Sequence, residues 1–139
     1  MRANSAAALV LALAAPALAA GCGGEREFGA AEFVDAANGK GAALALGGQV
    51  TTTESGEPVY AVRSESGSDP NPQLEEGHGG GTMIVAADAG VAADEFERCE
   101  SAADLTCFRA ANIVLRFEEM AAADRARISG AVSALASAG

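Results

Sequence analysis

One segment limits what this chain can fold into more than any other: the apolar run from Ala6 to Ala20. Arg2 is the only charged residue before Glu25, and the run contains only Ala, Leu and Val with a single Pro. A positive tip followed by a short apolar run and small residues is typical of a secretory signal peptide. The run spans 15 residues, whereas a membrane-spanning helix needs about 20. We therefore predict that residues 1–21 are removed and that the fold forms from the rest.

The end of this run contains a short motif around Cys22. The residues Ala19-Ala20-Gly21-Cys22 resemble the lipobox of bacterial lipoprotein precursors, in which small residues precede a cysteine. The resemblance implies that the Cys22 sulfur carries a diacylglycerol as a thioether, with further palmitate-type acylation, and that residues 22–27 form a lipidated tether. It also implies that the protein lies at the cell membrane, where the lipid anchors it on the extracytoplasmic side. The alternative is ordinary signal cleavage after Ala19, which would leave Cys22 as an incidental thiol.

The other two cysteines are interpreted in the light of that resemblance. If Cys22 carries lipid, Cys99 and Cys107 remain, an even number outside a reducing cytosol, which favours a disulfide. Closing a loop this short would stabilise the fold by about 2.5 kcal/mol through loop-closure entropy. Two buried, reduced cysteines are the alternative. We expect no metal site or cofactor, because two thiols and the distant His78 do not supply the four ligands of a structural zinc site.

Size and charge restrict the class of protein. The 118 residues that follow residue 21 carry 8 basic and 19 acidic side chains, which suits one domain, placed at 28–139. Because a chain this acidic repels phosphate backbones, we expect no nucleic-acid partner. Beyond its leader the chain resembles only uncharacterised small envelope lipoproteins.

Hydrophobic periodicity predicts the element order α-β-β-β-α-β-α. The helices are expected within 25–41, after the capping residue Asp88, and from Ala121; the strands are expected at 42–53, 58–64, 82–87 and 111–118, with loops at 65–81 and 105–109. We predict an α+β two-layer sandwich of about four mostly antiparallel strands with helices on one face. The alternative for 82–117 is a right-handed β-α-β crossover with two parallel strands.

The helix after Asp88 shows a clear division of faces. Its buried stripe is expected to be Ala92, Phe96, Cys99 and Ala103. Its solvent-exposed face is expected to hold Asp94, Glu95, Glu97, Arg98 and Glu100.

Two short motifs suggest chemistry but are incomplete. His78-Gly79-Gly80-Gly81 matches the oxyanion loop of some esterases, but the sequence contains no G-x-S-x-G motif and no second histidine. The segment from Asp69 begins like a calcium loop and then lacks the required Gly and the final Glu. Flexible carboxylates in that segment could still gather weakly around a cation. We therefore do not expect an enzyme, and a hydrolase is the least favoured alternative.

Four polar residues are candidates for ligand binding because they are expected on the sheet or at strand ends: Arg63, Arg109, Asn112 and Arg116. Guanidinium groups there would hold a carboxylate or a phosphate. The competing interpretation, which we favour from the sequence, is that these arginines pair with the surplus of Asp and Glu.

These observations lead to a functional expectation. We expect a lipid-anchored module of the cell envelope that acts through contacts with a protein or peptide partner. A carrier of a small ligand or metal ion, using the 65–81 loop and the candidate arginines, is the alternative.

Overall fold

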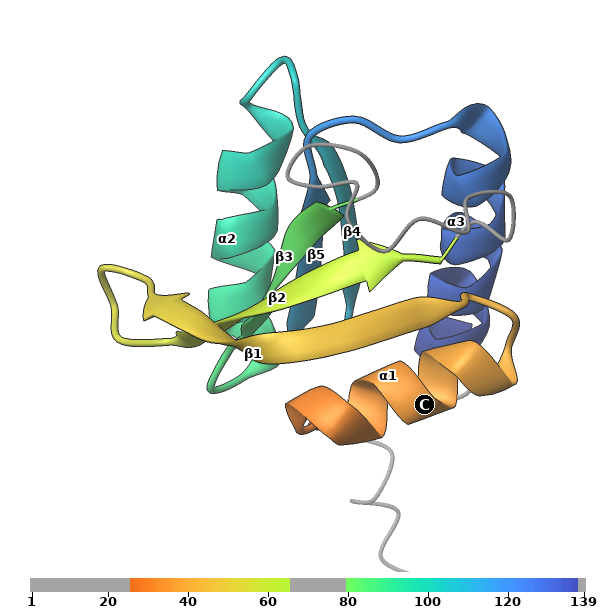
Figure 1. Ribbon diagram of the computed structural model, residues 1–139. Coiled ribbons are helices and arrows are strands. Elements are labelled where there is room, and N and C mark those ends of the chain that lie inside the picture. Colours follow the sequence, from red (N-terminus) through yellow and green to blue (C-terminus); the bar gives the residue numbers. More distant parts are fainter. Residues whose placement is uncertain (1–25, 66–79, 138–139) are drawn as a thin grey trace, which may run out of the picture.

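The computed structural model describes residues 26–65 and 80–137 (Figure 1). The elements follow in the order α1 (Ala30–Gly39), β1 (Leu44–Thr52), β2 (Pro58–Ser64), β3 (Gly80–Val85), α2 (Ala89–Glu100), β4 (Thr106–Ala110), β5 (Ile113–Phe117) and α3 (Ala122–Ser137). The predicted α+β class is confirmed, and the predicted element order is confirmed except that five strands replace about four. Within the described ranges, no helix combines the length and apolarity needed to cross a membrane.

All five strands form one antiparallel sheet in the spatial order β1-β2-β3-β5-β4. The strands β3 and β4, which α2 connects, are both antiparallel to β5 and therefore run parallel to each other with β5 between them. The alternative of parallel strands at the two ends of 82–117 is thus wrong, because β3 and β5 pair antiparallel; the parallel strands that α2 connects are β3 and β4. The expected mostly antiparallel sheet is confirmed.

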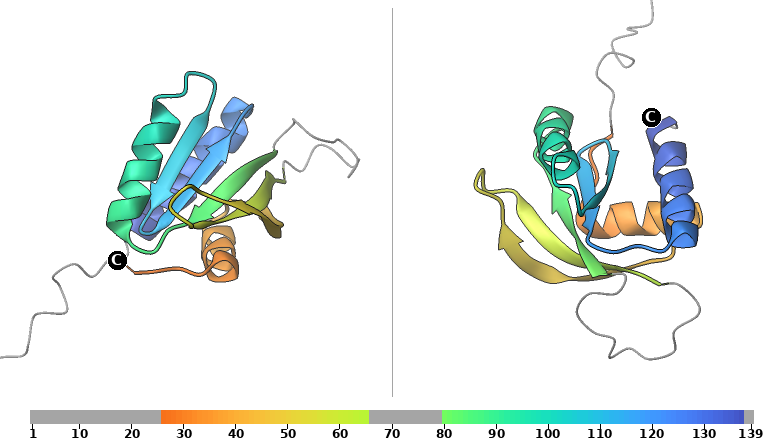
Figure 2. Two further views of the ribbon diagram at one scale, coloured as in Figure 1. Left: turned by 90° about the vertical axis from the view of Figure 1, so that its left-hand side faces the viewer. Right: turned by 90° about the horizontal axis from the view of Figure 1, so that it is seen from above.

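The helices lie on both faces of the sheet, not on one face as we predicted (Figure 2). One apolar cluster joins α1 and α3 to the sheet through residues such as Phe33, Ile128 and Leu115. A smaller cluster joins α2 to the other face through Ala92, Ile84 and Val114. The physical reason is that β3 and β5 are apolar on both faces, so each face must be covered to keep water away from it.

The sheet contains one strand more than predicted, because 105–109 is not a connecting loop. β4 pairs with β5 along its length, from Thr106 opposite Phe117 to Ala110 opposite Ile113. Ala111 and Asn112 form the two-residue turn between them, and Ala111 has a φ of 51°. A residue with positive φ in a hairpin turn is normally Gly, Asn or Asp, so an alanine there gives no turn signal in the sequence.

Helix α1 ends where the sequence predicts and is fastened to β1. The helix ends at Gly39, inside the predicted range 25–41, and Gly41 turns the chain with a φ of 92°. The Asn38 side chain accepts a hydrogen bond from Leu44 N at 2.7 Å and donates to Leu44 O at 2.9 Å. These two bonds set the position of β1 relative to the helix.

Helix α2 confirms its predicted cap and two of the four residues of its predicted buried stripe, and a third, Phe96, is partly buried. The Asp88 side chain accepts a hydrogen bond from Val91 N at 2.9 Å, and Ala92 and Cys99 are buried. Glu95, predicted on the exposed face, is buried because it lies at helical spacing between those two residues. Its carboxylate pairs with exposed Arg98 at 3.0 Å. Ala103 lies beyond the end of the helix and is exposed, so its predicted place in the buried stripe is wrong.

Arg127 joins helix α3 to the loop before β1 and to the end of β2. The Arg127 guanidinium donates to Asp124 Oδ1 and to Ser64 Oγ, both at 2.7 Å, and to Ala42 O at 2.9 Å. Ser64 and Asp124 are both buried. A buried charge is tolerated when it is paired and hydrogen-bonded, and here the pairing joins α3 to the loop before β1 and to the end of β2.

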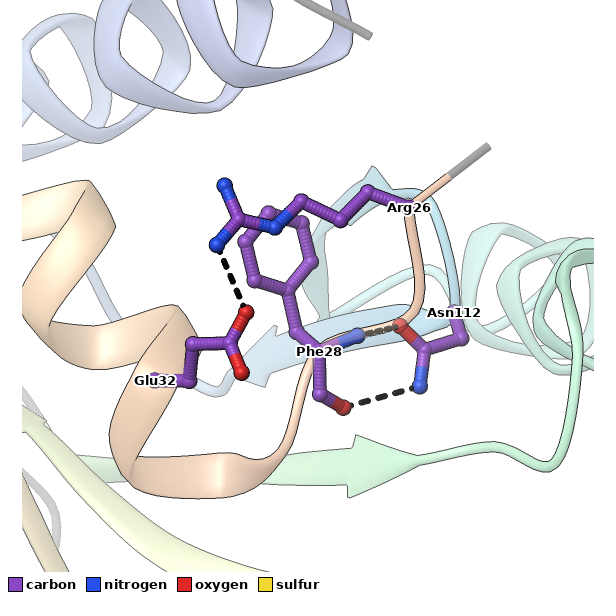
Figure 3. A network of polar contacts seen from close by, with 4 residues as sticks. All are labelled: Arg26, Phe28, Glu32 and Asn112. Carbon is purple, nitrogen blue, oxygen red and sulfur yellow. Dashed lines mark hydrogen bonds and ion pairs between the residues drawn. The ribbon is translucent and has the colours of Figure 1, made fainter. Parts of the chain in front are cut away.

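The first described residues are clamped onto the turn between β4 and β5 (Figure 3). The Asn112 side chain accepts from Phe28 N at 2.7 Å and donates to Phe28 O and to Ala86 O, both at 3.0 Å. Arg26 lies over the Phe28 ring, 5.0 Å from its centroid, and pairs with Glu32 at 2.8 Å. Arg26 therefore belongs to the folded domain, although we assigned it to the tether.

We predict that Asn112→Ala lowers the free energy of unfolding by about 2–3 kcal/mol, because it leaves three buried backbone groups without partners. Chemical denaturation monitored by circular dichroism measures the loss. Asn112→Asp is the matched variant: it keeps the acceptor for Phe28 N, removes both donors and buries a charge, so it should lose at least as much. Wild-type stability in both variants would contradict this role.

Candidate functional site

The face of the sheet that carries α2 is only partly covered. Helix α2 packs on β4 and β5, whereas the β1 and β2 half of this face extends beyond the helix (Figure 2). A groove of about 920 Å³ lies over that open half and reaches the ends of β3 and β5. This groove is the candidate functional site of the described part of the chain.

Small side chains form the floor of the groove. The strand register aligns Ala61 of β2 with Thr82 of β3, and Thr82 with Arg116 of β5. On the other side of Ala61, a Cβ added to Gly47 would come within 3.0 Å of the Ala61 Cβ. This row of small residues leaves the hollow, whereas the larger residues Val59, Ile84 and Val114 on the same face pack against α2.

Arg116 is held in a defined orientation at one side of the groove. Its Nε donates to Thr82 Oγ1 at 3.0 Å. Its cross-strand neighbour on the other side is Cys107, which is bonded to Cys99 of α2 with the two Cα atoms 6.0 Å apart. Within residues 26–65 and 80–137, the two terminal amino groups of Arg116 have no hydrogen-bond partner, so they remain available to a ligand.

Arg63 lies on the opposite side of β3, in register with Gly80. Its side chain is exposed and lines the same groove. No ion pair of Arg63, Arg109 or Arg116 occurs in the part of the chain that the structure describes, whereas Arg26, Arg98 and Arg127 each pair with a carboxylate. The pairing with Asp and Glu that we favoured from the sequence is therefore not seen for these three arginines among the described residues.

The structure brings together two of the four candidate binding residues and separates the other two. Arg63 and Arg116 line the groove. Arg109 shares their face of the sheet, because it pairs with Val114, but it lies on the edge strand β4 outside the groove. Asn112 lies at the other end of the sheet, and its amide is used by Phe28 and Ala86, so its predicted role in ligand binding is wrong.

Sequence reasoning missed the residues that shape the groove. Thr82 orients Arg116, and Gly81 allows β3 and β5 to approach. A Cβ on Gly81 would overlap Arg116 O and come within 2.6 Å of the Phe117 ring. A threonine or glycine at a strand start carries no signal of this kind without the register.

The Cys99–Cys107 pair is confirmed at bonding distance. Several other predicted features lie outside the described residues: Cys22, His78, the carboxylates Asp69, Glu75 and Glu76, and nearly all of the 65–81 loop. Among the residues that are described, no group of three or more His, Cys, Asp or Glu side chains is arranged to hold a metal ion.

Comparison with known proteins adds no relative to this description. The chain matches no protein-family model, and no match is found among curated proteins or among solved structures.

The chemistry of the groove is therefore judged from its residues alone. It presents two guanidinium groups, the Thr82 hydroxyl and the Glu118 carboxylate around a floor of Ala and Gly. Guanidinium groups without a carboxylate partner are suited to binding a carboxylate or phosphate oxygen.

We predict that replacing both Cys99 and Cys107 with Ala lowers the free energy of unfolding by about 2.5 kcal/mol, the loop-closure value for this short loop. Denaturation with and without reductant measures the effect, and the double variant should show no further loss when reductant is added. Two freely titratable thiols at these positions in the native protein would contradict the disulfide.

We predict that Gly81→Ala destabilises the fold by about 1–3 kcal/mol, because its Cβ would overlap β5. Gly80→Ala is the matched control, since a Cβ there meets no atom within 4 Å, and it should change stability by less than about 0.5 kcal/mol. Thermal denaturation of the two variants checks this. Equal stability of the two variants would show that the close approach of β3 and β5 is not the constraint at Gly81.

Proposed function

We propose that this chain is a lipid-anchored module on the extracytoplasmic side of a bacterial cell membrane. The observation that supports the proposal best is the bond between Cys99 and Cys107, because disulfides persist mainly outside the reducing cytosol. The bond uses two of the three cysteines. The remaining one is Cys22, which lies directly after the predicted signal peptide and is the residue that the lipobox resemblance assigns to the lipid.

We further propose that the module acts by contact with a protein or peptide partner and not by catalysis. Strand β1 lies at the edge of the sheet, and its residues 47–52 are exposed. An exposed edge strand can accept an additional strand from a peptide through main-chain hydrogen bonds. This arrangement supports the proposed mode of contact.

A second candidate function, binding of a small ligand, is favoured by the groove. The two arginines without a carboxylate partner would supply the binding groups, and the volume of about 920 Å³ falls within the usual range for small-molecule sites.

We predict that Cys22→Ser abolishes lipid attachment and releases the protein from the membrane fraction, because a serine hydroxyl does not form the thioether. Intact-mass measurement of the mature protein should give a product that begins at Cys22 with added acyl mass in the wild type. It should give no acylated product in the variant. Cell fractionation provides the second readout.

The double replacement of Cys99 and Cys107 with Ala is the matched control, since it removes two thiols and should leave the acyl mass unchanged. A wild-type product that begins at Ala20 and carries no acyl mass would overturn the anchoring proposal.

A further inference from the structure

We infer that the groove between Arg63 and Arg116 binds a small organic oxyanion, namely a carboxylate or phosphate group attached to a flat apolar body. The inference rests on the ligand-binding function proposed as the second candidate. It names the chemistry of that ligand and does not depend on the lipid anchor.

The first support is charge. The chain has a formal net charge of −10, yet two basic side chains, Arg63 and Arg116, line this one groove. Across the described ranges, Arg63 and Arg116 form no ion pair, although both lie on one face of a single sheet. Two such cations at one groove form a local positive site, and an anionic group is the ligand that complements them.

The second support is the geometry of the two arginines. Arg63 is in register with Gly80, and Arg116 is in register with Thr82, so the arginines flank β3 from its two neighbouring strands. The two strands that flank a central strand lie about 10 Å apart. Two arginine side chains that extend toward each other across this distance can contact the same ligand. The hydrogen bond from Arg116 Nε to Thr82 Oγ1 leaves its two terminal amino groups as a fork for an oxyanion.

The third support is the floor beside the arginines. Ala45, Gly47 and Ala61 line the groove, and Leu105 adds an apolar contact at its side. Backbone and methyl groups of this kind form a shallow surface on which a flat apolar group can lie. The oxyanion would then meet the arginines while the apolar part leaves water.

One residue of the groove limits the charge of the ligand. Glu118 also lines it and is exposed, and the rest of the chain is strongly acidic. Both repel a ligand with many negative charges. The groove is therefore suited to a single anionic head group and is unsuited to a polyanion such as a nucleic acid.

The test uses ligand-observed NMR titration of the full chain, solubilised in an uncharged detergent if it is membrane-bound. The probes are benzoate and phenyl phosphate, with benzyl alcohol as the neutral control and inorganic phosphate as the head group alone. We expect saturable binding of benzoate or phenyl phosphate with a dissociation constant of about 1 mM or lower, weakened by added salt. Whichever of the two binds more tightly identifies the head group. Benzyl alcohol and inorganic phosphate should bind at least about tenfold more weakly.

Three arginine variants make the test specific. Arg63→Gln and Arg116→Gln should each weaken binding by about tenfold or more. Arg109→Gln is the matched control, because it removes the same charge from the same face of the sheet outside the groove, and it should leave binding unchanged. Ala61→Leu keeps the net charge, fills the floor and should also abolish binding. Thermal denaturation confirms that each variant is folded.

The proposal is overturned if neither aromatic anion binds saturably, if benzyl alcohol or inorganic phosphate binds equally tightly, or if all three arginine variants behave alike. A protein without acyl mass at Cys22 would refute the anchoring proposal and leave this titration unaffected, so the two proposals fail separately.

Discussion

The whole fold depends on two central strands that are apolar on both sides. Met83 and Leu115 point into the cluster formed with α1 and α3, while Ile84 and Val114 point into the cluster formed with α2. Neither strand would be stable with one face in water, because each would expose a row of large apolar side chains. This requirement places a helix on the second face and explains why the expected arrangement with helices on one side is not formed.

The same requirement leaves the groove open. Within the described residues, one helix of 12 residues lies on the second face. It packs on β4 and β5 and covers the large residues Val59, Ile84 and Val114. The part of that face beyond the helix is lined by small residues such as Ala45, Gly47 and Ala61, so it needs no second helix to exclude water. The groove is thus a consequence of where the chain places its small residues, and the two arginines stand at its sides because the register puts them there.

The fold could be predicted from local patterns to a large extent, and the failures have physical causes. The bounds of β2 and the Asp88 cap rest on alternation and on short-range hydrogen bonding, and both are confirmed. Strand β4 was missed because its turn contains alanine at positive φ, and because Asn112 fits the alternation of a continuous strand. Glu95 was misplaced because its burial depends on which way the helix faces the sheet.

The candidate site was predictable only as a set of residue types. Arginines on strands suggest an anion site, and the sequence identifies Arg63 and Arg116 on that basis. Which arginines share a groove is decided by pairing between strands that are distant in the sequence, as between Arg116 and Thr82. The same pairing excludes Arg109, and the clamp on Phe28 excludes Asn112. No local pattern contains that information.

The hydrogen bonds between Asn112 and Phe28 also distinguish the two ends of the sheet. They hold the chain from Arg26 onward against the turn between β4 and β5, whereas Arg63, Gly80 and Arg116 belong to the other end of the strands. Three residues separate Arg26 from Cys22, and the four Cα-to-Cα steps between them reach at most about 14 Å. If Cys22 is the lipidated residue, the turn end of the sheet is therefore kept close to the bilayer. The groove lies at the far end of the same strands, the length of the sheet away from this point of attachment.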